Sequence, residues 1–350
     1  MTETIARSDK LAGRPIDPNA PFLEVRDLNV EFRIEDGIVR AVNGLSYTLG
    51  QGETLAILGE SGSGKSVSAQ AVMGILDTPP GFVTAGTVKF RGVDLLAKNK
   101  KGTFDHVVPE VRGSRIAMVF QDALTALNPV FTVGWQLGEM LRKHRGYSKK
   151  DAKEGAIELM ERVKIPSARE RVNSYPHEFS GGMRQRVMIA MALSLDPDVL
   201  IADEPTTALD VTVQAQIMEL LSELQAETGT GLILITHDLA VVAEVADRVV
   251  VMYAGMRMEV GEIQAVYHRP SHPYTLGLMK SLARHDMHVE RLTPIAGSPP
   301  DLLHIPTGCP FHPRCPYAKD ICSTEIPSLD AVGGGHASAC HFWQEVQIEI

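Results

Sequence analysis

The stretch that decides the fold is Gly59-Glu60-Ser61-Gly62-Ser63-Gly64-Lys65-Ser66. It fits the pattern G-x-x-x-x-G-K-S/T, with an apolar run before it at residues 54–58 and a helical pattern after it, from residue 65 to about residue 76. Glycines in such a loop let backbone N–H groups close around phosphate oxygens at a helix N-terminus. Lys65 would add a cation for the β- and γ-phosphates, and the Ser66 hydroxyl can bind Mg²⁺. The stretch therefore predicts a phosphate-binding loop (P-loop).

Apolar segments on both sides of this loop predict an α/β fold. Residues 22–34 and 39–49 alternate between apolar and polar, which indicates antiparallel strands. Further on, apolar runs at 115–120, 198–202, 231–236 and 248–253 are separated by helical stretches such as 213–225. That alternation is typical of a mostly parallel sheet with helices on its faces. We expect a P-loop core of this kind with an additional antiparallel β part.

The pattern also suggests how the chain is divided. Residues 1–21 contain three prolines and indicate a loose N-terminal arm. Residues 22–260 would form the nucleotide-binding domain, with a helical subdomain inserted at about 124–180. From residue 261 to residue 350 the chain is rich in proline and histidine and short of long periodic segments. This part is expected to be a small, irregular C-terminal module.

A pair of carboxylates ends one of the predicted strands. The apolar residues 199–202 lead into Asp203 and Glu204. An acidic strand end by itself is more often a solvated turn, but a P-loop enzyme needs a metal-holding acid and a water-orienting base. We expect Asp203 to hold Mg²⁺ and Glu204 to polarise the attacking water.

The segment Phe179-Ser180-Gly181-Gly182-Met183, upstream of Asp203, resembles the signature sequence of the ATP-binding cassette (ABC) ATPase family. Other family elements match in order. Gln121 follows a strand, Ala208-Leu209-Asp210 follows the carboxylate pair, and Thr236-His237-Asp238 follows another strand. Phe32 resembles the aromatic residue that stacks on adenine, although it could equally be a core residue.

The resemblance implies a mechanism and a dimer. Ser180, Gly181 and Gly182 would hold the γ-phosphate of a nucleotide bound to the opposite subunit, since backbone amides at a helix N-terminus attract anions. Gln121 would sense the metal and the nucleotide, and Asp210 would communicate across the dimer. His237 would contact the γ-phosphate. The family therefore implies Mg²⁺-dependent ATP hydrolysis by two paired subunits.

Within that family, the chain is most similar to the ATPase subunits of oligopeptide and dipeptide importers. The similarity is carried by residues 121–133 (QDALTALNPVFTV), by residues 268–275 (HRPSHPYT) and by the tail that begins Gly308-Cys309-Pro310. Met183 stands where many ABC signatures have glutamine, and this subgroup often shows methionine there. The resemblance implies a second, related ATPase chain and two integral membrane permease subunits as partners. A solute-binding protein outside the membrane would act indirectly.

Charge and hydropathy agree with a peripheral protein. The chain has 43 acidic and 34 basic side chains, a formal net charge of −9, which argues against a nucleic-acid partner. Its N-terminus is polar, and no apolar stretch approaches the roughly 20 residues that span a bilayer. We expect the chain to sit on the cytoplasmic face of the membrane through its permease partners.

All four cysteines, Cys309, Cys315, Cys322 and Cys340, lie in the C-terminal part. In a chain without an export signal, clustered cysteines favour a metal site over disulfides. Their spacing, C-x5-C-x6-C-x17-C, matches neither the usual zinc pattern nor the common ferredoxin ones. The resemblance to peptide importers implies a 4Fe–4S cluster, with zinc or four unligated thiols as alternatives. Since the cysteines are distant in sequence from Lys65 and Asp203, we expect nucleotide binding to survive their loss.

Two other functions remain open at this point. One is a soluble ABC ATPase that acts on nucleic acid or the ribosome, because such proteins share the motifs through Asp238. The other is a cluster-based redox sensor in which ATP is secondary. The transported solute also stays open, since dipeptides, longer peptides, nickel chelates and oligosaccharides all fit the family.

Overall fold

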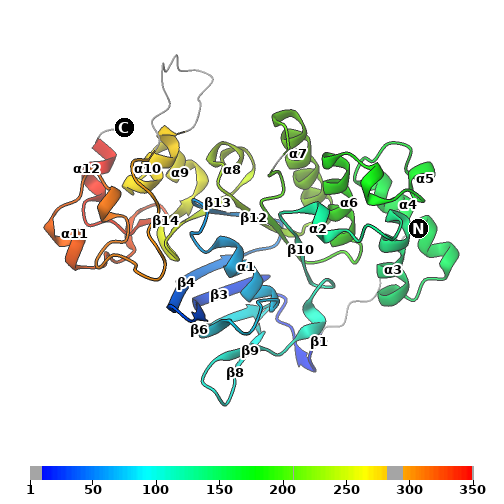
Figure 1. Ribbon diagram of the computed structural model, residues 1–350, viewed down its shortest axis with the longest axis horizontal. Helices are drawn as coiled ribbons and strands as arrows, with labels where there is room; N and C mark the ends of the chain where they lie inside the picture. Colours follow the sequence, from blue (N-terminus) through cyan, green and yellow to red (C-terminus); the bar gives the residue numbers. More distant parts are fainter. Residues whose placement is uncertain (1–9, 208, 282–294, 349–350) are drawn as a thin grey trace. The chain divides into compact units, whose positions relative to one another are not determined.

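The computed structural model describes residues 10–207, 209–281 and 295–348 (Figure 1). Within these residues the chain divides into two compact units. The first contains the described residues up to 50, residues 54–110 and the described residues from 236 onward, and the second contains residues 51–53 and 111–235. Each unit has its own sheet and helices, and each carries a different part of the predicted site.

The first unit contains an antiparallel sheet. Its strands run in the order β4-β3-β6-β9-β8, with β7 paired to β6. In β3, Val25, Leu28 and Val30 are buried while other positions are exposed, as expected for a sheet with one covered face. The expected arm also contains a short strand pair, β1 with β2. The bounds are β1 (Lys10–Leu11), β2 (Arg14–Pro15), β3 (Leu23–Ile34), β4 (Gly37–Leu49), β6 (Gly81–Phe90), β7 (Val93–Asp94), β8 (Leu96–Lys98) and β9 (Phe104–His106).

A second set of strands in the first unit carries the P-loop. β5 pairs with β13 in parallel, and β14, β16 and β15 follow as antiparallel strands. Every residue of β5 is buried, as expected for a strand covered on both faces. The bounds are β5 (Thr54–Leu58), α1 (Lys65–Met73), α8 (Leu239–Val245), β13 (Arg248–Tyr253), β14 (Met256–Glu262), α9 (Ile263–His268), α10 (Pro273–Lys280), η3 (His312–Arg314), α11 (Asp320–Thr324), β15 (Asp330–Gly333), β16 (His336–Ser338) and α12 (Trp343–Ile348).

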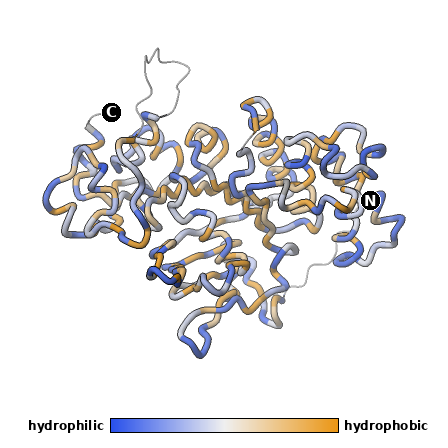
Figure 2. Tube along the Cα trace, viewed as in Figure 1, coloured by the Kyte–Doolittle hydropathy of each residue, from blue (hydrophilic) through white to orange (hydrophobic). Residues whose placement is uncertain are grey.

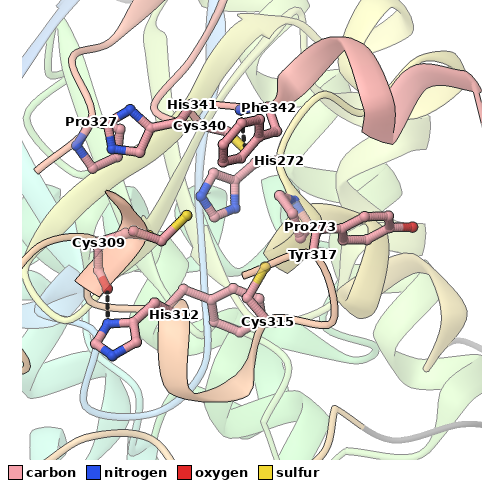
Figure 3. A pocket seen from close by; sticks show the side chains of 12 residues that line it. His272, Pro273, Cys309, His312, Cys315, Tyr317, Pro327, Cys340, His341 and Phe342 are labelled. Carbon is pink, nitrogen blue, oxygen red and sulfur yellow. Dashed lines mark hydrogen bonds between the residues drawn. The ribbon is translucent and has the colours of Figure 1, made fainter. Parts of the chain in front are cut away.

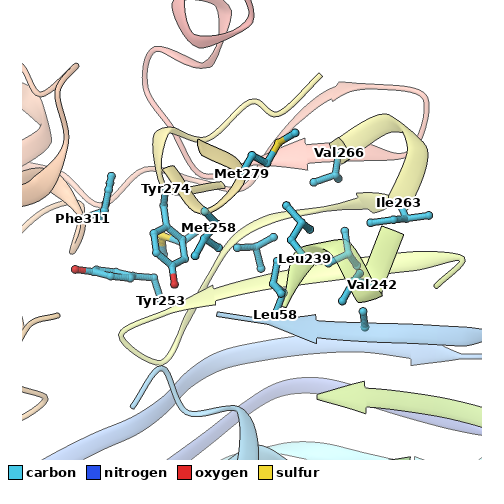
Figure 4. Close-up of a cluster of buried hydrophobic side chains, with 14 of the residues drawn as sticks. Leu58, Leu239, Val242, Tyr253, Met258, Ile263, Val266, Tyr274, Met279 and Phe311 are labelled. Carbon is cyan, nitrogen blue, oxygen red and sulfur yellow. The ribbon is translucent and has the colours of Figure 1, made fainter. Parts of the chain in front are cut away.

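The C-terminal part is more closely joined to this unit than its irregular sequence suggests. β16 extends the sheet at β14, and Tyr274, Phe311 and Cys309 share one buried cluster with Leu58 and Tyr253 (Figure 4). Figure 2 shows the hydrophobic residues concentrated along such buried strands. Because the apolar residues of the tail come in short, non-periodic runs, sequence periodicity could not reveal that they complete this core.

The second unit contains a parallel sheet of β10, β11 and β12. Between β10 and β11 the described residues form helices, and four of the unit's helices begin at a side-chain N-cap: Thr132, Ser148, Ser180 and Asp210. The bounds are β10 (Ile116–Val119), α2 (Ala123–Ala126), α3 (Val133–Arg145), α4 (Lys149–Arg162), α5 (Ala168–Arg171), η2 (Pro176–Glu178), α6 (Gly181–Leu193), β11 (Val199–Asp203), α7 (Val211–Thr228) and β12 (Gly231–Thr236), with η1 (Pro109–Val111) at the start of the unit.

Among the described residues, no helix combines the length and the apolar character that crossing a bilayer would need.

Candidate nucleotide and cysteine sites

The P-loop lies between β5 and α1, as the sequence predicts. Lys65 is buried at the first turn of α1, and its Nζ donates hydrogen bonds to the carbonyl oxygens of Gly59 (2.8 Å) and Glu60 (2.9 Å). Ser61 and Gly62 at the tip of the loop are exposed, whereas the Ser63 hydroxyl is buried and has no hydrogen-bond partner among the described residues. The loop thus keeps a cation and a polar group directed to its interior, as a phosphate site requires.

Close backbone approach explains why Gly64 must be glycine. Its φ is 97°, and a Cβ there would stand 2.1 Å from the carbonyl oxygen of Ala41 in β4. β4 also pairs with β3, where the half-buried Phe32 lies opposite Val39. Phe32 therefore lies on a strand adjacent to the one that contacts the P-loop, a position compatible with stacking on a base.

The C-terminal part also reaches the P-loop, which sequence reasoning missed. The Glu60 N–H donates to the Tyr274 hydroxyl at 2.7 Å, and the Glu60 carboxylate accepts from Arg314 at 2.6 and 3.1 Å. Arg314 lies immediately before Cys315 in the chain. Neither partner stood in a motif that predicts phosphate chemistry, so no sequence signal could have identified this contact.

The carboxylate pair stands at the end of β11 in the second unit. Asp203 is buried, and Glu204 adopts a left-handed backbone with φ of 44°. Glu204 Oε2 accepts hydrogen bonds from Gln121 Nε2 (2.9 Å) and from Thr207 Oγ1 (2.8 Å). A non-glycine residue at positive φ is uncommon and costs free energy, and such residues concentrate at functional sites. The structure thus brings together two predicted residues, Gln121 and Glu204, and adds Thr207.

The signature segment begins α6. Ser180 is its N-cap, and its hydroxyl accepts from the Met183 N–H at 3.4 Å. Ser180 and Gly181 are exposed, so the amide groups at this helix end face outward. Gly182 has a packing role instead, because a Cβ there would lie 2.6 Å from Val213 Cγ1 of α7.

The remaining motif residues lie at other helix starts. Asp210 is the N-cap of α7 and accepts from the Val213 N–H at 2.9 Å, with its side chain exposed. His237 is exposed after β12 in the first unit, where the next residue, Asp238, caps α8. Ala208 lies outside the described residues. Asp210 therefore has a helix-capping role besides the one implied by its motif.

An ordered loop precedes α3. The buried Gln136 donates from Nε2 to the carbonyl oxygens of Asn128 and Phe131 (both 3.0 Å), and its Oε1 accepts from the Asn128 N–H (3.0 Å). The loop exposes Val130 and Phe131, and Phe131 stacks on the exposed Trp135 at 4.0 Å. Gln136 thus holds the loop that exposes these apolar side chains. It lies just outside residues 121–133, so it was not identified from the sequence.

All four cysteines line one pocket in the first unit, together with apolar and histidine side chains (Figure 3). Backbone N–H groups two residues further along the chain, at Phe311, Tyr317 and Phe342, face the sulfurs of Cys309, Cys315 and Cys340. Burial raises the pKa of Cys315 to about 11 and that of Cys340 to about 12. In the described part of the chain, however, no three His, Cys, Asp or Glu side chains are arranged to hold a single metal ion.

The HRPSHPYT segment, residues 268–275, also anchors the tail. Glu259 is fully buried and accepts from the N–H groups of Ser271 (2.6 Å) and His272 (3.1 Å) and from His336 Nε2 (2.6 Å). His272 in turn caps α10 by accepting from the Tyr274 N–H. These bonds tie β14, α10 and β16 together.

Two family models match this chain. Residues 42–207 match the ABC transporter family, and residues 258–322 match the C-terminal region of oligopeptide/dipeptide transporters. The oligopeptide transport ATP-binding protein OppD of Salmonella typhimurium is 51% identical over 323 residues, covering 92% of this chain and 94% of that protein. The dipeptide transport ATP-binding protein DppD of Bacillus subtilis is 50% identical, covering 91% of this chain and 93% of that protein.

Solved structures are similar over the cassette. A dimeric ATP-binding cassette in a post-hydrolysis state, bound to ADP and Pi, has a TM-score of 0.59 and 27% identity, covering 69% of this chain and 98% of that one. CbiO1 of Clostridium perfringens, part of an ABC transporter complex, has a TM-score of 0.59 and 30% identity, covering 71% of this chain and 91% of that one. The chain belongs to the ATP-hydrolysing, ATP-binding subunits of ABC transporters, in the oligopeptide/dipeptide branch of that family.

Proposed function

We propose that this chain binds and hydrolyses ATP as the subunit that supplies the energy for peptide import by a membrane transporter. The observation that carries the proposal is the likeness to OppD and DppD over more than nine-tenths of the chain, with residues 258–322 matching the C-terminal region of oligopeptide/dipeptide transporters. The ATPase domain would comprise residues 22–260 and the C-terminal module residues 261–350. Within these two parts, residues 208, 282–294 and 349–350 lie outside the described residues.

Each motif residue has a proposed role toward ATP. Gly59, Ser61, Gly62, Ser63 and Gly64 would bind the phosphates with Lys65, which leaves its two carbonyl partners when a phosphate arrives. Ser66, Gln121 and Asp203 would hold Mg²⁺, which neutralises the phosphate charge. Glu204 would orient the attacking water, His237 would contact the γ-phosphate and Phe32 would stack on the base. The bond from Gln121 to Glu204 supports a shared role for these two residues.

A dimer is part of the proposal. Ser180, Gly181 and Gly182 would contact the γ-phosphate of a nucleotide held by a second ATPase subunit, and Asp210 would lie at the contact between the two. Two observations support this role: Ser180 and Gly181 are exposed, and a related cassette was solved as a dimer with ADP and Pi. The partner would be a related, non-identical chain.

The apolar loop before α3 supports contact with permease subunits. Val130 is 69% exposed and Phe131 is 38% exposed, while Gln136 makes hydrogen bonds to the backbone of the same loop. We propose that this surface faces the two integral membrane subunits on the cytoplasmic face. A solute-binding protein would deliver the peptide on the other side.

The cysteine pocket would hold a 4Fe–4S cluster, with zinc as the alternative. Its fit rests on the donor set: four cysteines in one pocket, with backbone amides facing three of the sulfurs. Amide hydrogen bonds of this kind tune iron–sulfur sites, and ligation would replace the protons that buried thiols otherwise retain. When bound, the cluster would tie together tail segments that are separated by long loops.

Transport by the reconstituted complex tests the import proposal. The chain, co-expressed with its permease subunits, should co-purify with two membrane proteins and drive ATP-dependent uptake of dipeptides or longer peptides. Nickel chelates and oligosaccharides are the comparison solutes. Uptake of one of these alone would overturn the peptide assignment, and co-purification with nucleic acid or ribosomes would overturn the transport assignment.

Analysis of metal content tests the cluster separately. Anaerobically purified protein should be brown, with about four iron and four sulfide per chain. Cys315→Ser should bleach it and speed proteolysis of residues 309–340. Colourless anaerobic protein with one zinc per chain would contradict the cluster.

A further inference from the structure

Glu60, the second residue of the P-loop, is fixed through three groups at once. Its carbonyl oxygen accepts from Lys65 Nζ (2.9 Å), its N–H donates to the Tyr274 hydroxyl (2.7 Å), and its carboxylate accepts from Arg314. Only the first partner belongs to the P-loop. The other two come from α10 and from the cysteine-bearing turn, more than 200 residues further along the chain.

The pair between Arg314 and Glu60 is bidentate. Nη1 stands 2.6 Å from Oε2, and Nη2 stands 3.1 Å from Oε1. The Arg314 side chain is 5% exposed and the Glu60 side chain 27%, so water screens the pair only partly. Two parallel charged hydrogen bonds fix both the position and the orientation of the carboxylate.

Arg314 is itself held in place. Its Nε donates to the Ala296 carbonyl oxygen (2.9 Å), its Nη1 also donates to the Tyr253 hydroxyl (3.2 Å), and its guanidinium lies 5.7 Å from the centre of the Tyr253 ring. The tail thus presents a preorganised guanidinium to the P-loop. A lysine at this position could supply the charge but neither the fork nor the stacking.

Arg314 also lies in the turn that carries two of the four cysteines. Its N–H donates to the Phe311 carbonyl oxygen, and the Cys309 and Cys315 N–H groups donate within the tail, to Cys322 and His312. One end of the contact therefore lies in the turn between Cys309 and Cys315, and the other is the phosphate-binding loop.

We propose that Arg314 and Tyr274 are positioning residues for ATP: they hold Glu60, and through Glu60 they keep the P-loop in its nucleotide-binding shape. This inference rests on the proposed role of residues 59–66 as the ATP site. It departs from the expectation that nucleotide binding is independent of the tail. Sequence separation suggested independence, but the fold places the two segments in contact.

Equilibrium binding of a fluorescent ATP analogue to the full chain tests the proposal. Arg314→Met should raise the Kd about tenfold or more, the usual range for coupling between linked sites. Tyr274→Phe removes only the hydroxyl, so a rise of about three- to tenfold is expected. Arg314→Lys should recover part of the loss.

A double-mutant cycle shows whether Arg314 acts through Glu60. If it does, Arg314→Met should cost little further affinity once Glu60→Gln is present. The matched control is Arg115→Met, which breaks a buried pair with Asp198 (3.2 Å) inside the second unit. That variant should lower thermal stability while leaving the Kd within about twofold of the wild type, the size of effect expected without coupling.

The assembled transporter supplies a readout that general destabilisation would not produce. Positioning predicts a raised KM for ATP with kcat little changed, whereas partial unfolding would lower kcat and leave KM unchanged. Folded Arg314→Lys and Tyr274→Phe variants that bind ATP like the wild type would overturn the inference. Wild-type protein that does not bind ATP would instead overturn the proposed ATP site.

Discussion

The N-termini of α1 and α6 have the same chemistry but different surroundings. α1 follows a glycine-rich loop and α6 begins with two glycines. Both helix ends present backbone amides, and both are predicted to contact phosphate. At α1, Lys65 is buried and bonded to its own loop, and the tail holds Glu60. At α6, Ser180 and Gly181 are exposed, and the Ser180 hydroxyl makes a long 3.4 Å capping bond.

This difference indicates how one chain can contain two phosphate-binding ends with separate tasks. An end that is enclosed by its own chain can bind a nucleotide alone, since its groups are preorganised. An end that faces outward, with few partners, is suited to a nucleotide brought by another subunit. The contrast therefore predicts one site that is complete in the monomer and one that is completed by dimerisation.

The largest expected effect is the loss of ATP hydrolysis in Glu204→Gln. This variant would also allow the α1 and α6 helix ends to be compared in a trapped dimer. Removing the carboxylate should slow ATP hydrolysis by about 10²-fold or more, because general-base catalysis typically contributes that much. ATP binding should persist and trap the ATP-bound dimer. Steady-state turnover and size-exclusion chromatography check both results. Turnover near that of the wild type would remove Glu204 from its role.

On the Glu204→Gln background, the two helix ends can be separated. Lys65→Ala should abolish ATP binding by the isolated chain, since it removes the enclosed cation. Ser180→Arg should leave that affinity nearly unchanged but prevent the ATP-dependent dimer, because a bulky side chain would fill the exposed end of α6. Analytical ultracentrifugation with and without ATP measures the dimer.

Equal losses of monomer affinity in the two variants would contradict the contrast. It would then follow that the α6 end contributes to the same nucleotide as the P-loop. Ser180→Ala is the matched control, since it removes the hydroxyl without adding bulk, and it should weaken the dimer less than arginine does.

Substitution of two P-loop glycines by alanine should lower the free energy of unfolding by different amounts. Gly64→Ala combines a left-handed φ with a Cβ 2.1 Å from the Ala41 oxygen, so unfolding free energy should fall by about 3 kcal/mol. Gly62→Ala also has a positive φ but meets no atom within 4 Å, and about 1 kcal/mol is expected. Urea unfolding of both variants tests this order, and equal losses would contradict it.

The sequence predicted those parts of the structure whose chemistry is local. The P-loop between β5 and α1 follows from one eight-residue motif, and the parallel strands follow from short apolar runs. β6 and β14 were missed, because their apolar residues do not stand out from their neighbours. Register and strand order depend on partners far along the chain, which periodicity does not encode.

Contacts between distant segments are the other part that could not be predicted. Arg314 and Glu60 are 254 positions apart, and each looks like an ordinary surface charge in the sequence. Glu259 lies in a segment for which the sequence predicted no strand, yet it is fully buried and accepts three hydrogen bonds. A buried carboxyl group of this kind is identified only when its partners are placed around it.

The smallest expected effect distinguishes the two glycines of the signature. At Gly182 a Cβ would lie 2.6 Å from Val213 Cγ1, and valine is too stiff to move aside easily. Gly182→Ala should therefore lower the unfolding free energy by about 1 kcal/mol, the overpacking cost less the gain in helix propensity. At Gly181 the nearest atom is Leu209 Cδ2 at 3.4 Å, so Gly181→Ala should change stability by less than about 0.5 kcal/mol.

Gly182→Ala should lower stability more than Gly181→Ala does, but formation of the ATP-dependent dimer should not follow this order. The methyl group added by Gly181→Ala would lie at the exposed start of α6, the helix end that we propose contacts the partner's nucleotide. Gly181→Ala should therefore weaken the trapped dimer while the monomer stays as stable as the wild type. Thermal unfolding and ultracentrifugation of the same two samples measure both quantities. A Gly181→Ala protein that dimerises normally would show that this face of α6 is not in contact with the partner, because a methyl group in a phosphate-sized contact cannot be accommodated without loss.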